Sequence, residues 1–220
     1  MSAESPRRPA QWPALAVLAI LLSACAPAQQ HPAAAPSAPR LLTLAIQVEP
    51  NLFNTQLVGN GGPPGGRRQP LTIAHDYLVV QSDKGVYEPR LAREQISAEK
   101  GTWRVNPDGS METMWTIRPN IKWQDGTPFT SADIAFTFAV YSDPEVLSDD
   151  TGVLSLMRAV EATDPLSFVI HWSTIYAHAD EAPALDPLPL HLLDELYRTD
   201  KANFDKSPRF RTDFIGLGPY

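Results

Sequence analysis

The stretch KWQDGTPFTSADIAFTF, residues 122–138, contains two aspartates that suggest acid–base chemistry. Paired carboxylates hydrolyse glycosides when one donates a proton and the other attacks or activates water. Asp125, however, precedes a glycine, which is a position where turns favour aspartate. Asp133 follows Thr130 by three residues, which is where the first turn of a helix favours an acid. We therefore predict no catalytic residue here and interpret Asp125 as a turn residue and Asp133 as a charge at the start of a helix.

The histidines do not match a metal-binding or catalytic motif. Among them, His171 and His178 with Asp180 are the group whose types could hold a metal, but no H-E-x-x-H spacing joins them. A surface or strand-facing position suits these histidines better, so we predict no metal and no cofactor. The sequence also lacks a G-x-S-x-G nucleophile motif and a phosphate-binding Walker motif.

Alternating and helical patterns indicate an α/β chain. Residues 103–106 and 111–117 read as a hairpin around Pro107-Asp108-Gly109, with Met111, Thr113, Trp115 and Ile117 on one face. Four tryptophans, Trp103, Trp115, Trp123 and Trp172, could line a pocket, but their places near alternating strands favour core packing.

Further elements are expected on both sides of this hairpin. A helix begins after Thr130 and ends before 143–144, with Ile134, Phe138 and Tyr141 on its buried face. The remaining expectations are a strand at 42–48, a strand pair at 159–164 and 167–172, and an amphipathic helix from about His191.

Charge excludes one class of partner. The 220 residues contain 18 Lys and Arg against 25 Asp and Glu, for a formal net charge of -7. Binding to nucleic acid depends on a dense basic surface, and the sequence has no basic stripe of that kind. We therefore expect no nucleic-acid partner.

The first residues have the layout of an export signal. Arg7 and Arg8 precede the apolar run 14–22, which is too short to span a bilayer core of about 30 Å. Leu22-Ser23-Ala24 then leads to Cys25, the only cysteine, and this stretch looks like a bacterial lipobox. We predict a signal peptide at 1–24 and lipidation of Cys25. The alternatives are an ordinary signal peptide that ends near a cysteine, or a buried free cysteine.

Residues 25–40 come after the predicted signal and have many prolines and alanines and one charge, at Arg40. Such a composition cannot build a core and suits a semi-extended tether. We therefore expect an extracytoplasmic protein, held on the membrane by its lipid, whose folded part begins near residue 41.

Five stretches together resemble the family 5 extracytoplasmic solute-binding proteins, the peptide and nickel binders of ABC importers. They are LTLAIQVEPNLFN, GVYEPRLARE, NPDGSMETMWTIRPNIKWQDGTPFTSADIAFTF, VEATDPLSFVIHW and FIGLGPY. The resemblance covers most of residues 42–220, and its third stretch is the most specific.

The resemblance implies an α/β, periplasmic-binding-protein-like fold of the type II, two-lobe kind. Residues 41–220 would form an incomplete first lobe with a mixed sheet and flanking helices, the second lobe being absent. It further implies oligopeptides or similar solutes as ligands, ABC permease and ATPase subunits as partners, and no enzymatic activity. The residues just after the first strand, Val48, Glu49 and Asn51, become candidate ligand contacts, although a plain strand exit explains them as well.

Two other interpretations stay open at the level of sequence. One is an inactive, truncated remnant of such a binder, because half a cleft should bind poorly. The other is an exported lipoprotein hydrolase that uses Asp125 and Asp133.

Overall fold

The computed structural model describes residues 43, 52–54, 57, 71, 73–146, 148, 152–181 and 185–218. The chain forms two units, Met1–Leu44 and Ala45–Tyr220. In the first unit only Thr43 is described, and it is exposed; all the elements named below belong to the second unit. Apart from Thr43, the predicted signal peptide, Cys25, the tether and the strand at 42–48 lie outside the described residues.

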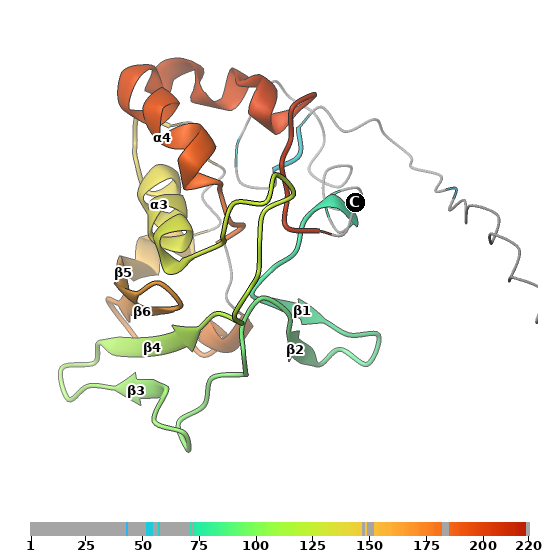
Figure 1. Cartoon of the computed structure of the whole chain (residues 1–220). Coiled ribbons are helices and arrows are strands. Elements are labelled where there is room, and N and C mark those ends of the chain that lie inside the picture. The colour runs from blue at the N-terminus through green and yellow to red at the C-terminus, as the bar shows by residue number, and fades with distance from the viewer. Residues whose placement is uncertain are drawn as a thin grey trace, which may run out of the picture. The chain divides into compact units, whose positions relative to one another are not determined.

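Four short strands come first along the described chain, and helices then precede and follow a further pair of strands (Figure 1). The strands are β1 (Val79–Gln81), β2 (Tyr87–Pro89), β3 (Trp103–Val105), β4 (Met111–Thr116), β5 (Met157–Asp164) and β6 (Ser167–Trp172). The α-helices are α3 (Ser131–Tyr141) and α4 (Leu190–Thr199). The 3-10 helices are η3 (Leu154–Leu156), η4 (Ala179–Glu181), η5 (Lys201–Lys206) and η6 (Pro208–Phe210).

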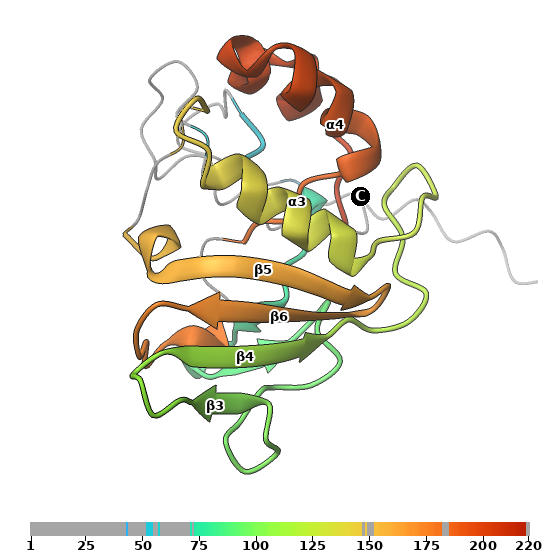
Figure 2. The same ribbon diagram turned by 90° about the vertical axis from the view of Figure 1, so that its left-hand side faces the viewer.

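Four strands pair in the order β3-β4-β6-β5, and every neighbouring pair in this sheet is antiparallel (Figure 2). The predicted hairpin and the predicted second strand pair are both confirmed. In the hairpin, the Ser110 amide donates to Asp108 Oδ1 at 2.9 Å, and Gly109 takes φ +83°, a backbone conformation that favours glycine. The second pair begins two residues earlier than expected, at Met157.

The tryptophans predicted to pack in the core do so, with Trp115, Trp123 and Trp172 at most 2% exposed and Trp103 partly buried against them. Trp115 lies opposite Phe168 in the register of β4 and β6, and their rings stack at 6.5 Å. The indole of Trp172 donates to the buried Thr113 hydroxyl at 3.0 Å. A buried hydroxyl and a buried indole N–H thus satisfy each other, which removes the cost of leaving either without a partner.

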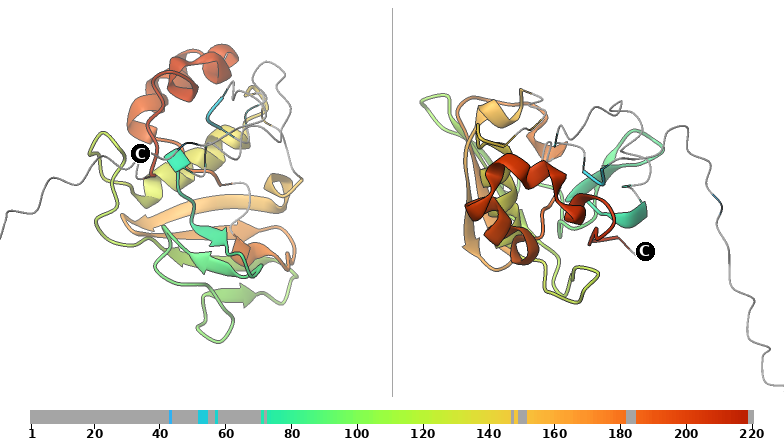
Figure 3. Two further views of the ribbon diagram at one scale, coloured as in Figure 1. Left: turned by 90° about the vertical axis from the view of Figure 1, so that its right-hand side faces the viewer. Right: turned by 90° about the horizontal axis from the view of Figure 1, so that it is seen from above.

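A second hairpin, β1–β2, lies on one side of this sheet. Its strands are antiparallel, with Val80 opposite Glu88. The hairpin is behind the sheet in Figure 2 and in front of it in the left panel of Figure 3, so it covers a single face. An isolated bridge between Ala92 and Ile117, both fully buried, joins the chain after β2 to the chain after β4.

Helix α3 runs beside β5, and α4 lies beyond it (Figure 2). The predicted start after Thr130 and end before 143–144 are confirmed. The predicted buried face needs a correction: Ile134 is buried, but Phe138 is only partly so, and Phe136 is 8% exposed. The reason is that α3 packs against two partners, because the Phe136 ring meets the edge of Tyr197 from α4 at 5.7 Å.

Helix α4 begins one residue before the predicted start and buries Leu193 completely. Its far end is held by Lys201, whose ammonium lies 2.6 Å from the carboxylate of Asp143, just after α3. Across the part of the chain that the structure describes, no helix is both long enough and apolar enough to cross a membrane.

Candidate functional site

The predicted ligand contacts Val48, Glu49 and Asn51 lie outside the described residues, as does Cys25. The residues just after them are described. The Phe53 amide donates to the Phe210 carbonyl at 2.7 Å, and the Phe53 ring stacks on Phe214 at 5.2 Å. The chain that leaves the predicted contacts is therefore fastened to the far end of the sequence.

Gln124 joins that far end to the segment before β1. Its Oε1 accepts from the Gly216 amide at 2.8 Å, while its Nε2 donates to the carbonyls of Ala74 at 3.2 Å and Gly218 at 3.3 Å. The Gly218 amide also donates to the Ala74 carbonyl, at 3.1 Å. One side-chain amide thus binds two segments that are far apart in sequence.

His75 lies at the centre of the same contacts and is 5% exposed. Its Nδ1 accepts a hydrogen bond from the Leu217 amide at 3.2 Å, and its ring also bonds to the backbone of Pro187. Burial lowers the pKa of His75 to about 4, although the Pro187 hydrogen bond opposes the shift. His75 is therefore neutral at pH 7.

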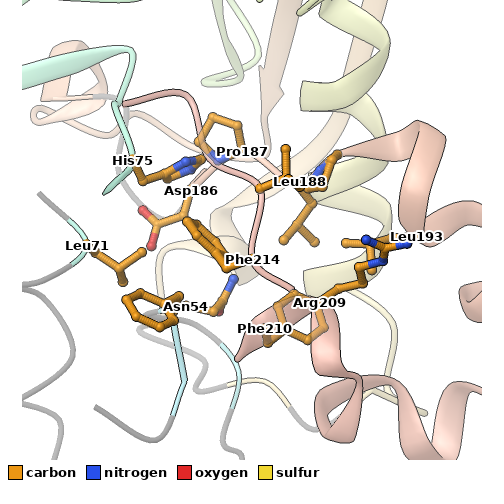
Figure 4. Close-up of a pocket in the computed structure, with 13 residues that line it drawn as sticks. Asn54, Leu71, His75, Asp186, Pro187, Leu188, Leu193, Arg209, Phe210 and Phe214 are labelled. Carbon is orange, nitrogen blue, oxygen red and sulfur yellow. The ribbon is translucent and has the colours of Figure 1, made fainter. Parts of the chain in front are cut away.

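A small cavity adjoins His75 (Figure 4). His75 and Pro187 lie at one end of it and Arg209 at the other. Its volume is about 10 Å³, which is room for about one water molecule. This cavity is too small to hold a peptide or another solute of that size.

An open hollow of about 610 Å³ lies between the end of α3 and the start of β5. That volume is within the range of small-molecule sites, roughly 300–1,000 Å³. Its acid, Asp143, is already bound, because Lys201 lies 2.6 Å away and the Tyr197 hydroxyl donates to it at 2.7 Å. We assign no ligand to this hollow.

The two aspartates that suggested hydrolysis both bond to the start of α4. Asp133 is 4% exposed, and its carboxylate accepts from the Thr130 amide at 2.8 Å and the Leu190 amide at 3.1 Å. Burial raises the pKa of Asp133, and these hydrogen bonds work against that rise. Asp133 is thus a helix-capping group with no free side for a substrate.

Asp125 forms the predicted turn, because its Oδ1 accepts from the Thr127 amide at 2.9 Å. Its Oδ2 lies 2.7 Å from Nε2 of His191. Partial burial would raise the pKa of Asp125, but the hydrogen bonds from His191 and Thr127 hold the pKa below its ordinary value. Asp125 is therefore a carboxylate at pH 7 that fastens α4 to the turn.

His171 and His178, considered above for metal binding, have separate partners. His171 lies 3.5 Å from Glu112 and 3.4 Å from Glu161 on the neighbouring strands, and His178 lies 2.7 Å from Glu181. Within the described ranges, no group of three or more His, Cys, Asp or Glu side chains is arranged to hold a metal.

The sequence patterns did not indicate that His75, Gln124 and His191 would connect distant segments of the chain. Their partners lie 142, 92 and 66 residues away, respectively, and no local spacing reports such a contact. The one available signal was FIGLGPY, whose glycines allow the close approach to Ala74.

Comparison with known proteins places this architecture in a family. Residues 87–220 match the family described as bacterial extracellular solute-binding proteins, family 5. The periplasmic murein peptide-binding protein MppA of Escherichia coli is 34% identical over 71 residues, which cover 32% of this chain and 11% of that protein.

Solved structures of similar fold include three that hold a bound ligand. The oligopeptide-binding protein AppA of Bacillus subtilis, solved with a nonapeptide, has a TM-score of 0.61 at 19% identity, covering 78% of this chain and 31% of its own. NikZ of Campylobacter jejuni, solved with Ni(L-His), has a TM-score of 0.60 at 20% identity, with 80% and 31% covered. An oligopeptide-binding protein of Thermus thermophilus, solved with a pentapeptide, has a TM-score of 0.55 at 21% identity, with 66% and 29% covered.

At these identities the solved structures show the fold, and they confirm the predicted α/β, periplasmic-binding-protein-like class. The chain spans about three tenths of the length of each. The family match itself covers more than half of the chain, from β2 through the Gly216–Gly218 segment. This chain therefore belongs to the family 5 bacterial extracellular solute-binding proteins.

Proposed function

We propose that this chain serves as substrate-binding component of an ABC importer, with residues 41–220 belonging to its first lobe. Its solutes are oligopeptides or molecules of similar chemistry. The single observation that carries the proposal is the family match over residues 87–220. The peptide named for MppA and for two of the solved relatives supports the solute class.

Within this proposal, Val48, Glu49 and Asn51 contact the solute, and Glu49 receives the amino group of a peptide. The resemblance of the LTLAIQVEPNLFN stretch to the family supports this role, and Phe53, two residues after Asn51, contacts Phe210 and Phe214. Extended backbone at this place would pair with a peptide by strand addition. Release to the permease and ATPase subunits would then come with the opening of the lobes.

The mechanism is binding without chemical conversion. Asp133 is buried among backbone amides and Asp125 is bound to His191, which counts against the paired-carboxylate hydrolase. We propose further that the lipid on Cys25 holds the chain on the outer side of the cytoplasmic membrane or on the cell surface. Stable anchoring needs about two acyl chains, which a lipobox cysteine receives.

The test is calorimetric titration of the full chain, made soluble by Cys25→Ser, with a library of three- to nine-residue peptides and with Ni(L-His). We expect saturable heat with peptides that have a free amino end. Glu49→Gln should weaken that binding about tenfold or more, the effect of losing one hydrogen bond to a charged group. N-acetylated peptides have no free amino group, so they should bind with equal affinity to the proteins with and without Glu49→Gln.

The matched control is Glu88→Gln, an exposed glutamate on β2 that should leave the titration unchanged. Circular dichroism establishes that each variant is folded. A folded protein that gives no saturable heat with any of these solutes would contradict the proposal and favour an inactive remnant.

A further inference from the structure

His75 is enclosed by aromatic rings from three separate segments. Its ring stacks on Trp123 at 6.0 Å and meets the edges of Tyr77 at 5.7 Å and Phe214 at 5.8 Å. These surroundings offer contact to an uncharged imidazole but little compensation for the hydration that an imidazolium would lose.

The hydrogen bonds of His75 require a single neutral tautomer. The Leu217 backbone N–H can only donate, so Nδ1 of His75 must accept and carries no proton. Proline has no N–H, so the bond to the Pro187 backbone runs from the other ring nitrogen to its carbonyl. A proton added at Nδ1 would place two N–H groups face to face and break the bond to Leu217.

The segment that His75 holds, residues 214–218, has otherwise pH-independent attachments. Its amides bond to Gln124 and to the Ala74 carbonyl, and the side chain of Phe214 stacks on Phe53. None of these groups titrates between pH 4 and pH 7. Among the described residues, His75 is thus the contact of residues 214–218 with the segment before β1 that titrates in this pH range.

The charged groups around His75 are mostly bound to others. Asp186 and Arg209 line the same small cavity from the segment before α4 and from η6. The His191 ring of α4 lies 6.2 Å from the Trp123 ring, and His191 pairs with Asp125. Next to His75 in sequence, Asp76 pairs with Arg90, and Tyr77 contributes a phenol. Among the described residues, no carboxylate forms an ion pair with His75 that would stabilise its charged form.

We propose that neutral His75 is an acid-sensitive latch, which holds residues 214–218 against the segment before β1 and releases them when its ring is protonated. The released segment is the FIGLG part of the C-terminal motif. The latch does not depend on the solute proposed above, and its test uses no solute.

Proton linkage determines how pH changes the opening equilibrium of residues 214–218. The pKa of His75 is about 4 with the segment closed, against 6.5 for an exposed histidine. The open state therefore binds more protons, so opening is favoured as the pH falls from about 6.5 to about 4, and closure is fully stable above 6.5. The opening equilibrium should rise roughly 50-fold between pH 7 and pH 4.5.

The test is amide hydrogen exchange by NMR on the full chain from pH 7 to pH 4.5, expressed as protection relative to the unstructured rate. The Leu217 and Gly218 amides should be less protected than Ile170, an amide in the core of the sheet. Their protection should fall roughly 50-fold over this range. In the wild type, the ring signals of His75 should shift with the same midpoint as the Leu217 amide signal.

The variant His75→Gln keeps an acceptor and a donor but does not titrate, so protection of Leu217 should stay level with pH. The matched control, His178→Gln, changes an exposed histidine and should keep the wild-type fall. The latch is refuted if Leu217 is as protected as Ile170 at every pH, or if the fall persists in His75→Gln. Should that variant fail to fold, separate midpoints for His75 and Leu217 in the wild type would refute it equally.

Discussion

At the scale of single residues, the acids of the 122–138 stretch show how residue type can mislead about chemistry. Asp125 and Asp133 are eight positions apart in a motif that resembles an active site, yet both reach the first turn of α4. The Asp133 carboxylate accepts hydrogen bonds from the Thr130 amide at the start of α3 and from the Leu190 amide at the start of α4. Its burial is the cost of satisfying two otherwise orphaned amides.

Asp133→Ala should therefore lower stability, not abolish a reaction. The Thr130 and Leu190 amides would lose their acceptor, and we expect the free energy of unfolding to fall by about 2–3 kcal/mol. Urea unfolding at pH 7 measures this. Asp194→Ala, which removes an exposed ion pair with Arg198, should cost less than about 0.5 kcal/mol. Equal costs for the two variants would contradict the capping role.

At the scale of elements, the FIGLGPY motif has a packing explanation that its letters do not reveal. A Cβ on Gly216 would lie 2.0 Å from the Ala74 carbonyl oxygen, and one on Gly218 would lie 2.7 Å from the His75 amide nitrogen. Both glycines are thus required by the close approach of two backbones, and not by a turn.

Gly216→Ala should consequently destabilise the joint between residues 214–218 and the segment before β1. Backbone atoms cannot move aside as a flexible side chain can, so we expect a loss of at least about 2 kcal/mol in the free energy of unfolding. Gly109→Ala is the control, because that glycine has φ +83° but open space around it, and should cost about 1 kcal/mol. Chemical denaturation compares them, and a smaller loss for Gly216→Ala than for Gly109→Ala would refute the packing argument.

At the scale of the whole molecule, membrane attachment and solute binding pose separate questions. The family match and the fold concern residues 87–220 and their surroundings, whereas Cys25 lies outside the described residues. Membrane attachment is therefore a prediction from the sequence of residues 7–25 alone, and it needs its own experiment.

Cys25→Ser should release the protein from the membrane fraction of expressing cells, because the thiol is the only group in the stretch that can take the lipid. Fractionation with immunoblotting measures this, and metabolic labelling with a fatty acid should mark the wild type alone. Ser37→Thr, a conservative change in the predicted tether and outside the 22–25 stretch, is the control variant and should stay in the membrane fraction. Membrane association that survives Cys25→Ser would rule out the lipid anchor.

Local elements were predictable because their causes are local. The hairpin around Pro107-Asp108-Gly109 and the start of α3 at Thr130 each depend on residues two to four positions apart. The buried face of α3 was predicted in part, since the pattern shows one apolar stripe, whereas the packing of Phe136 against Tyr197 depends on a second helix. The candidate contacts Val48, Glu49 and Asn51 stay predictions.

The α/β class, the family and the hydrogen-bonded turns could be read from the sequence alone, because periodicity and short-range bonding depend on neighbouring residues. The second role of Asp133, at the start of α4, and the roles of His75 and Gly216 became visible only in the folded chain. Their partners, Leu190, Leu217 and Ala74, come from distant parts of the chain. Contacts of that kind depend on how packed layers bring backbone groups together, and no spacing along the chain encodes them.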